Sequence, residues 1–549
     1  MATAPAATQT SPRSSTGWRA AILLAAAALA VVGLWHAQRF FDDDAYITLR
    51  YAARLLDGHG PTWNDGERVE GYSHPLWLAQ IAALGLLRID LPLATQVLGI
   101  ASLAGIFLIW WRSGAWMIAL LLVASLAGIA IWSVGGLETV GYCFWILLAV
   151  WLVRRAVEES RAGDRHASRT ALGAGLALAG VALMRPEGPA VAVAALAGFL
   201  GARAGRVFLV ALAGFAIPTA AHLLWRVSYY GDLIANAARA KAGSLPLPLL
   251  VEQSLGYLRT TAPEWLGSVL VGVAMLATSR DRRSAAWMLL PAVPLLGLVL
   301  AGGGDHMPGA RLLLPPVVLI VFAAASAGPP RSRGARIGIS ALAVAAACWQ
   351  TGMLVRHPPI RDAAATVGEI VGRALERELE PGSLVTTSTA GSVPYFAPSL
   401  RFIDTLGLSD RWIARRSIDR VVTTLQRLPG HSKGDGAYIL RRKPDAIILG
   451  GADGVLGYDA TGYFLSDYEL LTAAEFRSNY WPYLFHAPIP PRLRGHVRVR
   501  QMIDRATGTY PYTVYLRNDS RAAQRMAMRG IRLQPPWLRG APRSPSSAR

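Results

Sequence analysis

Blocks of apolar residues long enough to cross a membrane recur through residues 1–355 of this 549-residue chain. A transmembrane helix needs roughly 17 to 25 such residues, because the hydrocarbon core of a bilayer is about 30 Å thick. Of all residues 53% are hydrophobic and 16% are charged, whereas a soluble domain carries about 25% charged residues. The sequence therefore predicts a polytopic α-helical membrane protein.

The strong basic charge does not indicate a nucleic-acid partner. The formal net charge is +20, but many of the arginines stand in short loops between apolar blocks and do not form one continuous stripe. Arginine in short loops marks the cytoplasmic side of a membrane protein. The basic residues are therefore expected to set the orientation of the chain in the membrane.

About eleven transmembrane helices are predicted from the apolar blocks. They cover residues 18–35, 91–111, 114–134, 138–153, 170–184, 189–201, 207–228, 265–278, 285–301, 312–327 and 337–355. Residues 74–87 are also apolar, but counting them as a span would place the arginine-rich loop 154–169 outside. We therefore expect 74–87 to form a helix at the outer interface of the membrane.

The orientation follows from the positive-inside rule. Arg13 and Arg19 place the N-terminus in the cytoplasm, and the loops at 112, 154–155, 203–206, 280–283 and 331–336 then all lie on the same side. The alternative for the first block is a cleaved signal peptide, which would leave the bundle without its first helix. The expected location is the inner (plasma) membrane, with the first outer loop, residues 36–90, outside the cytoplasm.

Three consecutive carboxylates, at residues 42–44, begin that outer loop. Asp43 or Asp44 is placed to cap a helix that ends near Gly58. A cap needs one carboxylate, so one alternative is that the other two are simply solvated. Carboxylates at a membrane surface are costly, which favours a functional site with a general base, a metal ligand or both.

Beyond residue 355 the composition becomes that of a soluble protein. Residues 356–519 are expected to form an extracytoplasmic α/β domain, with a helix around Val367 to Leu375 and strands at 383–387 and 446–449. Residues 497–502 and 510–516 are expected to pair as a hairpin. The segment 520–549 is rich in Arg, Pro and Ser and is predicted to be a disordered tail.

Several outer-side motifs together resemble the GT-C membrane glycosyltransferases, and more narrowly the terminal arabinofuranosyltransferase of mycobacterial cell-wall arabinan and its bacterial relatives. The motifs are DDAYITLRY at 43–51, VEGYSHPLW at 69–77, GLET at 136–139, RPEG at 185–188, GGGDHMPGAR at 302–311, DTLGLSD at 404–410 and GHSK at 430–433. His74 departs from the pattern, where Asn or Ser is more usual.

The resemblance implies a glycosyltransferase that moves a sugar, with arabinofuranose as the nearest precedent, from a polyprenyl-phosphate donor to a cell-envelope glycan acceptor on the outer face of the membrane. Nucleotide sugars are not expected outside the cytoplasm, so a lipid-linked donor taken from the surrounding lipids suits that side. Asp43 and Asp44 are the candidate catalytic carboxylates, acting as general base, or as nucleophile or ion-pair stabiliser if configuration is retained. Asp42 is a weaker candidate.

Cationic side chains on the outer side are candidates for holding the donor phosphate. The expected substrate-binding residues are Arg185, Arg311, His306 and Lys241, together with Glu70, Tyr72, His74 and Glu138 from the motifs. Each cation also has a simpler explanation, since the arginines can reach the headgroups, Lys241 can face lipid and His306 can be an ordinary loop residue. Glu138 can cap a helix, and Glu187 can pair with Arg185.

The metal and acceptor sites are less defined by sequence. A divalent cation such as Mg²⁺ or Mn²⁺ suits carboxylates beside a phosphate, although the spacing does not require one. The aromatic residues Tyr480, Trp481 and Tyr483 are candidates for stacking on an acceptor sugar or for ordinary packing.

Two other functional classes suit a polytopic chain. A transporter or flippase for a lipid-linked sugar would show internal repeats and polar residues near mid-span, and neither feature is clear here. A non-catalytic regulator on the same scaffold is the other alternative, because a fold does not determine a function.

Overall fold

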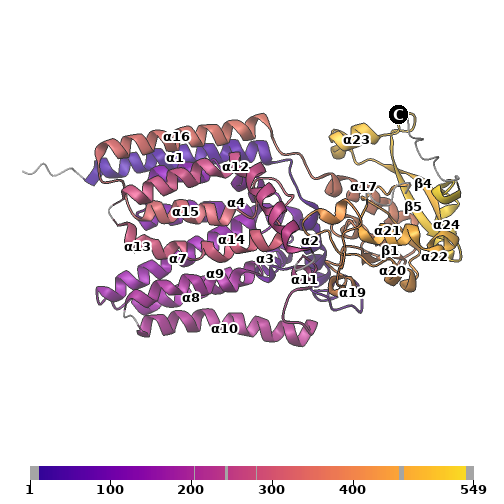
Figure 1. Cartoon of the computed structure of the whole chain (residues 1–549), viewed down its shortest axis with the longest axis horizontal. Helices are drawn as coiled ribbons and strands as arrows, with labels where there is room; N and C mark the ends of the chain where they lie inside the picture. Colours follow the sequence, from indigo (N-terminus) through magenta and orange to yellow (C-terminus); the bar gives the residue numbers. More distant parts are fainter. Residues whose placement is uncertain (1–11, 203–204, 242–244, 280, 457–462, 539–549) are drawn as a thin grey trace, which may run out of the picture.

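The computed structural model describes residues 12–202, 205–241, 245–279, 281–456 and 463–538. It has two parts that lie end to end, a helical bundle formed by the first 356 residues and a smaller domain with a β-sheet (Figure 1). The sequence boundary near residue 355 thus coincides with the end of helix α16.

The bundle contains seven described helices that are long and apolar enough to cross a membrane. They are α1 (Pro12–Ala37), α4 (Leu91–Ser113), α7 (Thr139–Arg161), α8 (Ala167–Met184), α10 (Gly205–Tyr230), α12 (Leu247–Thr278) and α16 (Arg333–Arg356). An eighth candidate is a pair of segments, Met117–Ala124 and Ala127–Val134, that meet at 62°. The prediction of a polytopic helical protein is confirmed.

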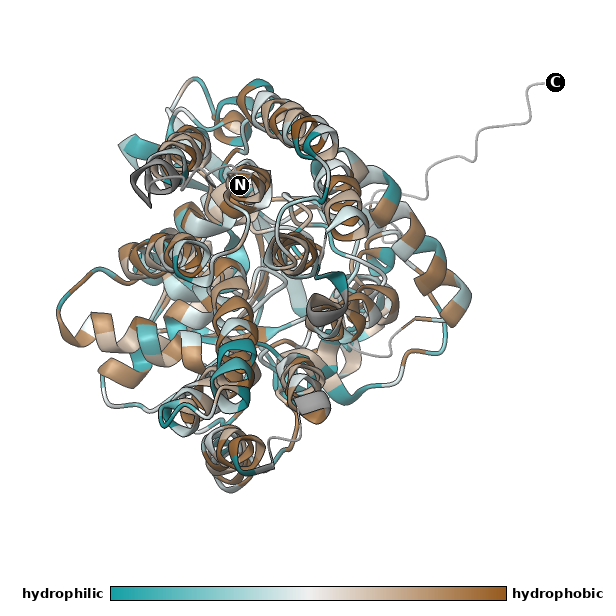
Figure 2. Ribbon diagram, turned by 90° about the vertical axis from the view of Figure 1, so that its left-hand side faces the viewer, coloured by the Kyte–Doolittle hydropathy of each residue, from teal (hydrophilic) through white to brown (hydrophobic). Residues whose placement is uncertain are grey.

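Four shorter apolar helices complete the bundle: Pro75–Leu86, Gly188–Leu200, Trp287–Gly302 and Leu314–Ser326. The last three lie on predicted spans, and Pro75–Leu86 (α3) lies on the stretch expected at the interface. Leu24, at 70% exposure, and Leu224, at 72%, face outward, and hydrophobic residues occur on outer faces of the helices (Figure 2). Such surfaces suit lipid contact. The count of eleven spans stays a prediction.

The predicted cytoplasmic loops at 112, 154–155 and 331–336 lie at one end of the bundle. Arg19 donates to the carbonyl of Trp111 at 2.7 Å, and Arg154 donates to the carbonyl of Ser326 at 2.7 Å. The backbone N–H of Arg331 donates to Thr278 at 3.0 Å. The opposite end carries α2 (Asp43–Leu56), α3 and α11 (Asn236–Lys241) and faces the sheet domain (Figure 1).

The start of α2 corrects the predicted helix cap. Asp42 is the N-cap, and its carboxylate accepts a hydrogen bond of 2.9 Å from the backbone N–H of Asp44. The predicted caps, Asp43 and Asp44, lie in the first turn of the helix. At the other end α2 stops at Leu56, and Gly58 follows with a φ of +84°, as expected for the end of a helix.

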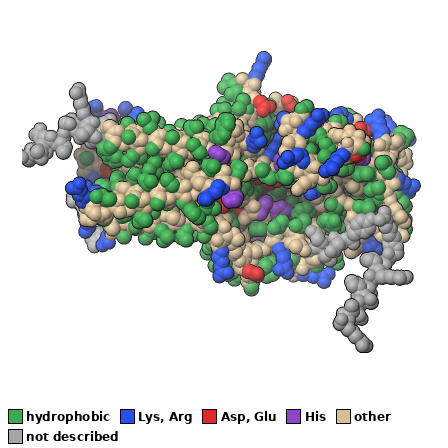
Figure 3. All heavy atoms as spheres, turned by 90° about the horizontal axis from the view of Figure 1, so that it is seen from above, with side chains coloured by type: hydrophobic (Ala, Val, Ile, Leu, Met, Phe, Trp, Pro, Cys, Tyr) green, Lys and Arg blue, Asp and Glu red, His purple; other side chains and the backbone are tan. Residues whose placement is uncertain are grey.

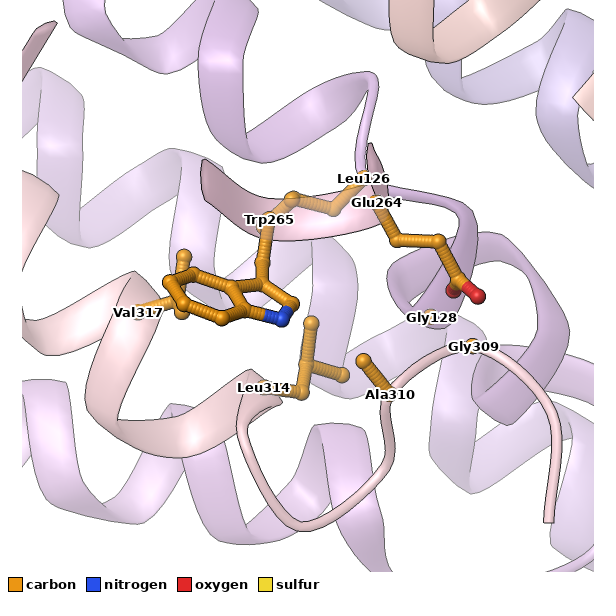
Figure 4. Close-up of a pocket in the computed structure, with 8 residues that line it drawn as sticks. All are labelled: Leu126, Gly128, Glu264, Trp265, Gly309, Ala310, Leu314 and Val317. Carbon is orange, nitrogen blue, oxygen red and sulfur yellow. The ribbon is translucent and has the colours of Figure 1, made fainter. Parts of the chain in front are cut away.

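Two glycines bring the bent helix pair close to the loop before α15 (Leu314–Ser326). A Cβ at Gly128 would lie 2.3 Å from the carbonyl oxygen of Gly309, whose φ is +75°. A cavity of about 10 Å³ lies beside this contact, with Glu264 and Trp265 of α12 on its wall (Figure 4). The contact fixes the position of the loop that carries His306 and Arg311.

The C-terminal domain is built on a six-stranded sheet in the order β2-β1-β3-β5-β4-β6. The strands are β1 (Leu384–Thr387), β2 (Arg401–Asp404), β3 (Ala446–Ile447), β4 (Tyr480–Pro488), β5 (Thr509–Arg517) and β6 (Ile531–Arg532). β1 runs parallel to β2 and β3, whereas β5 pairs antiparallel with β3 and β4. The predicted α/β class is confirmed.

Helices surround this sheet. They are α17 (Ala363–Glu378), α18 (Ser392–Tyr395), α19 (Arg411–Arg415), α20 (Gly436–Arg442), α21 (Leu465–Thr472), α22 (Ala474–Asn479), α23 (Val497–Met502) and α24 (Arg521–Ala527). α17 contains the predicted helical stripe, and α18 and α17 pack against α2. The domain is thereby attached to the first outer loop.

Two predictions for this domain were wrong. Residues 497–502 form helix α23, and the partner of β5 is β4, which offers nine paired positions along its length. Residues 521–527 form α24, with Ala523 and Met526 buried, and residues 531–532 add a strand to the sheet. The described part of the predicted tail is therefore ordered, and residues 539–549 lie outside the described residues.

Candidate active site

The acidic triplet lies where the helical bundle meets the sheet domain. On the face shown in Figure 3, charged and histidine side chains gather where the largely hydrophobic half of the molecule meets the charged half. The three carboxylates have different surroundings, because each points to a different set of partners.

Asp43 binds the C-terminal domain. Its carboxylate accepts hydrogen bonds from the backbone N–H groups of Gly391 at 3.2 Å and Ser392 at 2.8 Å, and from the Ser392 hydroxyl. The backbone N–H of Asp43 also donates to the carboxylate of Asp362 at 3.3 Å. Burial and the neighbouring Asp362 charge raise the pKa of Asp43 to about 7, although the bonds from Ser392 oppose this shift. Asp43 thus joins two parts of the fold.

Asp44 is the most accessible member of the triplet. Its side chain is 26% exposed, and its Oδ2 lies 3.2 Å from Nζ of Lys241. Burial alone would raise its pKa, but the positive charges of Lys241, Arg311 and His306 outweigh burial and lower the pKa of Asp44 to about 2. The Asp44 carboxylate is therefore ionised and faces a cationic group of side chains.

Asp42 is the least exposed member of the triplet. Burial and the adjacent Asp44 charge raise its pKa well above the usual value for a carboxyl group. One of its oxygens accepts the backbone N–H of Asp44. These contacts make Asp42 a helix cap, in keeping with its weaker standing as a catalytic candidate.

Two of the cationic side chains near Asp44, Arg311 and His306, come from the loop after α14 (Ala292–Gly302). Nε of Arg311 lies 2.7 Å from Oδ2 of Asp305, and its guanidinium stacks over Trp132 at 5.5 Å. His306 lies nearby with 42% of its side chain exposed. Burial would raise the pKa of Asp305, but the charges of Arg311, His306 and Lys241, together with the hydrogen bond from Arg311, outweigh burial and lower that pKa. The loop therefore supplies a fixed guanidinium and an accessible imidazole.

His431 is a residue of this site whose role the sequence did not single out. Its ring lies 5.0 Å from that of His306 and stacks on Phe464 at 5.7 Å. Burial, and then the charge of His306, lower the pKa of His431 to about 4. The segment 430–433 was noted only as part of the resemblance, and the contact with His306 depends on the tertiary fold.

A buried polar network lies next to the triplet and contacts α2 one turn after Asp44. The Glu138 carboxylate is 2.8 Å from Arg185 and 3.4 Å from Nδ1 of His74. Nε2 of His74 is 2.6 Å from the hydroxyl of Thr48, one turn along α2 from Asp44. The predicted pair of Arg185 and Glu187 is confirmed, at 2.6 Å. The network connects α2 with the ends of α7 and α8.

This network already engages the guanidinium of Arg185. Its side chain is only 11% exposed and is engaged by two carboxylates, whereas Lys241 and His306 are both more than 40% exposed. His74 is buried as well, and burial lowers its pKa despite the neighbouring Glu138. Direct contact of these buried residues with a substrate stays a prediction.

Glu70 and Tyr72 belong to a separate cluster. Glu70 is buried in an ion pair with Arg226 at 2.8 Å, and the hydroxyls of Tyr72 and Tyr230 are 3.0 Å apart. The structure thus brings together Asp44, Lys241, His306 and Arg311. It places the Glu138 network beside them, and it gives Glu70 and Tyr72 other partners.

The expected divalent cation has no ligand cluster in the described ranges. Within them, no three His, Cys, Asp or Glu side chains converge as a metal site. Both oxygens of Asp43 accept hydrogen bonds, and Asp44 faces Lys241. The cation stays a prediction.

Comparisons with known proteins cover both parts of the chain. A family model described as a domain of unknown function (DUF8728) matches residues 359–515. The terminal β-(1→2)-arabinofuranosyltransferase of Mycobacterium tuberculosis is 30% identical over 342 residues, with 54% of each chain covered. The enzyme of the same name from Corynebacterium glutamicum is 30% identical over 254 residues, covering 40% of this chain and 36% of that one.

Among solved structures, ArnT from Cupriavidus metallidurans in the apo state aligns with a TM-score of 0.49 and 12% identity, over 74% of this chain and 89% of that one. The chain spans about half the length of the first curated relative. The resemblance that the motifs indicated is confirmed in sequence: over about half of its length, this chain is similar to terminal β-(1→2)-arabinofuranosyltransferases.

Proposed function

We propose that this protein is a glycosyltransferase that moves a sugar from a polyprenyl-phosphate donor to a cell-envelope glycan on the outer side of the membrane. Arabinofuranose is the proposed sugar, because the similar curated proteins are named for its transfer. The observation that carries the proposal is the accessible Asp44 carboxylate, whose Oδ2 lies 3.2 Å from Nζ of Lys241 at the end of the apolar bundle that faces the sheet domain (Figure 1).

Asp44 is the proposed general base. An acceptor hydroxyl must lose its proton as it attacks the sugar, and a carboxylate within hydrogen-bond reach can take that proton. The side chain of Asp44 is 26% exposed, whereas the oxygens of Asp43 already accept bonds from Gly391 and Ser392. If configuration is retained, Asp44 would instead serve as nucleophile or ion-pair stabiliser.

Lys241 and His306 are the proposed contacts for the donor phosphate. The leaving phosphate gains negative charge as the glycosidic bond breaks, so nearby cations stabilise the transition state. Both side chains are accessible, and the buried Arg311 adds a fixed positive charge behind them. Asp43 would hold the triplet in place without contacting the donor.

The lipid part of the donor would approach from the bilayer side. Exposed apolar side chains stand on both sides of α11 in the chain, with Leu233 at 64%, Ile234 at 51% and Leu247 at 71% exposure. α11 ends at Lys241. A prenyl chain lying against these residues would therefore bring its phosphate near Lys241.

The test is transfer or hydrolysis of synthetic polyprenyl-phosphate sugars by the purified protein. We expect Asp44→Asn to lower turnover about 100-fold or more, since general base catalysis contributes about that much. Asp57→Asn is the matched control, because Asp57 is an exposed carboxylate at the other end of α2. Equal turnover in Asp44→Asn and the parent would remove Asp44 from the mechanism. If the parent turned over none of the donors, the transferase proposal would fail and transport of a lipid-linked sugar would be favoured.

A further inference from the structure

A large cleft opens on the outer part of the molecule, away from the acidic triplet. Its volume is about 1000 Å³, and its walls are residues 66–69 of the first outer loop, residues 228–231 at the end of α10, and parts of α19 and α20. Both the bundle and the sheet domain therefore contribute to it. A volume of this size is in the upper part of the range for ligand sites.

A stacked aromatic pair, the exposed Trp412 and the half-buried Tyr438, lines part of the cleft. The rings of Trp412 and Tyr438 stack with centroids 5.6 Å apart and an angle of 14° between their planes. Trp412 is 56% exposed even though it is one of the largest apolar side chains. Elsewhere in the lining the guanidinium of Arg68 lies 4.7 Å from the centroid of the Tyr229 ring, and that of Arg441 lies 5.6 Å from the centroid of the Trp412 ring. A flat, exposed aromatic ring such as that of Trp412 suits stacking on the C–H faces of a sugar.

The polar groups around these rings are paired with one another. Arg442 donates to Glu67 at 2.9 Å, and the indole N–H of Trp412 donates to Asp435 at 2.9 Å. The Tyr438 hydroxyl donates to Asp410 at 3.0 Å. The lining holds five arginines and three carboxylates, and two carboxylates outside it, Asp232 and Glu469, pair at 2.7 Å with Arg415 and Arg416. These pairs leave little excess charge for an anion, and they hold several donors and acceptors in fixed positions. Such a lining suits a neutral ligand that is rich in hydroxyl groups.

The cleft is connected to the proposed catalytic carboxylate through α11. The first residue of α11, Asn236, donates from its side chain to the carbonyls of Gly407 at 2.8 Å and Leu408 at 2.9 Å, just before the wall at 410–412. The last residue of α11 is Lys241, the partner of Asp44. A six-residue helix is roughly 9 Å long, a length that two or three sugar units can span.

We propose that this cleft binds a neutral oligosaccharide, with Trp412 as the stacking surface and Arg68 and Tyr229 as further contacts in the lining. The inference rests on the proposed function, in which the oligosaccharide is the acceptor whose end reaches Asp44. It places the sugar-stacking residue at Trp412 and not at the aromatic cluster of β4. Trp481, in that cluster, is half-buried and covered by Arg532 at 4.0 Å.

The test is binding of synthetic tetrasaccharides of arabinofuranose, galactofuranose and mannopyranose to the purified full-length protein, measured by calorimetry without a donor. We expect Trp412→Ala to weaken binding about tenfold, as loss of one aromatic stacking contact implies. Trp412→Phe should retain most of the affinity, and Arg68→Ala should weaken it. Trp481→Ala is the matched control and should bind as the parent does.

The outcomes separate this inference from the proposed function. No binding by any tetrasaccharide, equal binding by Trp412→Ala and the parent, or loss of binding only in Trp481→Ala would each overturn the inference. Because no donor is present, binding that depends on Trp412 would support the cleft even if sugar transfer were absent. Conversely, if Trp412→Ala left sugar transfer unchanged at limiting acceptor concentration, the proposed function would stand. The cleft would then not be the binding site of the acceptor.

Discussion

The carboxylate of Asp43 accepts a hydrogen bond of 2.8 Å from the backbone N–H of Ser392, a residue 349 positions later in the chain. Close packing accompanies the bond, because a Cβ at Gly391 would lie 1.9 Å from the carbonyl oxygen of Asp43. On the same helix, Arg50 donates to the carbonyls of Pro394 and Leu400. The position of the acidic triplet therefore depends on the C-terminal domain as well as on the bundle.

Asp43 should make the stability of the protein pH-dependent. Its pKa is about 7 in the folded state against 3.8 ordinarily, so the folded state holds a proton that the unfolded state releases between these values. The contribution of Asp43 to the free energy of unfolding is fully present below pH 3.8, and it is lost as the pH rises through about 7. The unfolding-temperature advantage of the parent over Asp43→Asn should thus be largest at pH 5 and shrink towards pH 8.

Comparing the parent with this variant is necessary because other carboxyl groups shift in the same direction. Burial also raises the pKa values of Glu70, Asp404 and Asp467 to about 7. Their contribution is common to both proteins and cancels in the difference. A constant difference between pH 5 and pH 8 would contradict the assignment to Asp43.

Replacing Lys241 should move the acidic limb of the pH–rate profile. Lys241 is the largest of the charges that lower the pKa of Asp44 to about 2, so Lys241→Met should raise that pKa. Asp44 must be ionised to accept a proton, and the acidic limb of kcat/KM should therefore shift to higher pH. Lys241→Arg, which keeps the charge, should restore the parent profile. An unchanged acidic limb in Lys241→Met would show that Lys241 does not control the ionisation of Asp44.

Removing the charge of Glu138 should strongly destabilise the bundle. In Glu138→Gln, Arg185 loses one of its two carboxylate partners in a buried site, where breaking an ion pair costs about 3–5 kcal/mol. Glu158→Gln is the control, because it removes a 57% exposed carboxylate paired with Arg154 and should cost about 0.3–0.5 kcal/mol. Unfolding temperatures in detergent test both, and similar values for the two variants would refute the prediction.

A methyl group at Gly128 should displace the loop that carries His306 and Arg311. The new Cβ would meet the carbonyl oxygen of Gly309 at 2.3 Å, and such overpacking costs about 1–3 kcal/mol. Gly256→Ala, where no atom lies within 4 Å, should be neutral or stabilising because alanine favours the helix by about 1 kcal/mol. We expect Gly128→Ala to lower both the unfolding temperature and sugar transfer. Parent-like values of both would show that the loop does not depend on this contact.

Local patterns in the sequence were sufficient to predict the helical bundle. A long apolar segment can be recognised from consecutive residues alone, without knowledge of the fold. The predicted blocks at 91–111 and 337–355 accordingly coincide with α4 and α16. The cap was misplaced by one or two residues, since three adjacent aspartates offer the same capping oxygen and only tertiary contacts, such as that of Asp43 with Ser392, distinguish them. That contact joins distant parts of the chain, and no local pattern contains it.

The errors in the C-terminal domain have a similar cause. Val497 and Val499 alternate as they would in a strand, but the long β4 occupies the edge of β5. The composition after Asp519 suggested disorder, yet two residues, Ala523 and Met526, are enough to anchor α24. In the site, the sequence indicated Asp44, Lys241, His306 and Arg311 separately. Their proximity, and the addition of His431, required the fold.

The separation between Asp43 and Ser392 has a consequence for biosynthesis. At roughly 5–20 residues per second, the ribosome needs about 20 to 70 s to make the 349 residues between them. During that interval the acidic triplet has been synthesised, but the hydrogen-bond donors that hold it do not exist. A newly made chain would therefore acquire a fixed triplet only after its C-terminal domain had been made and folded, which keeps incomplete chains from presenting a finished site to membrane lipids.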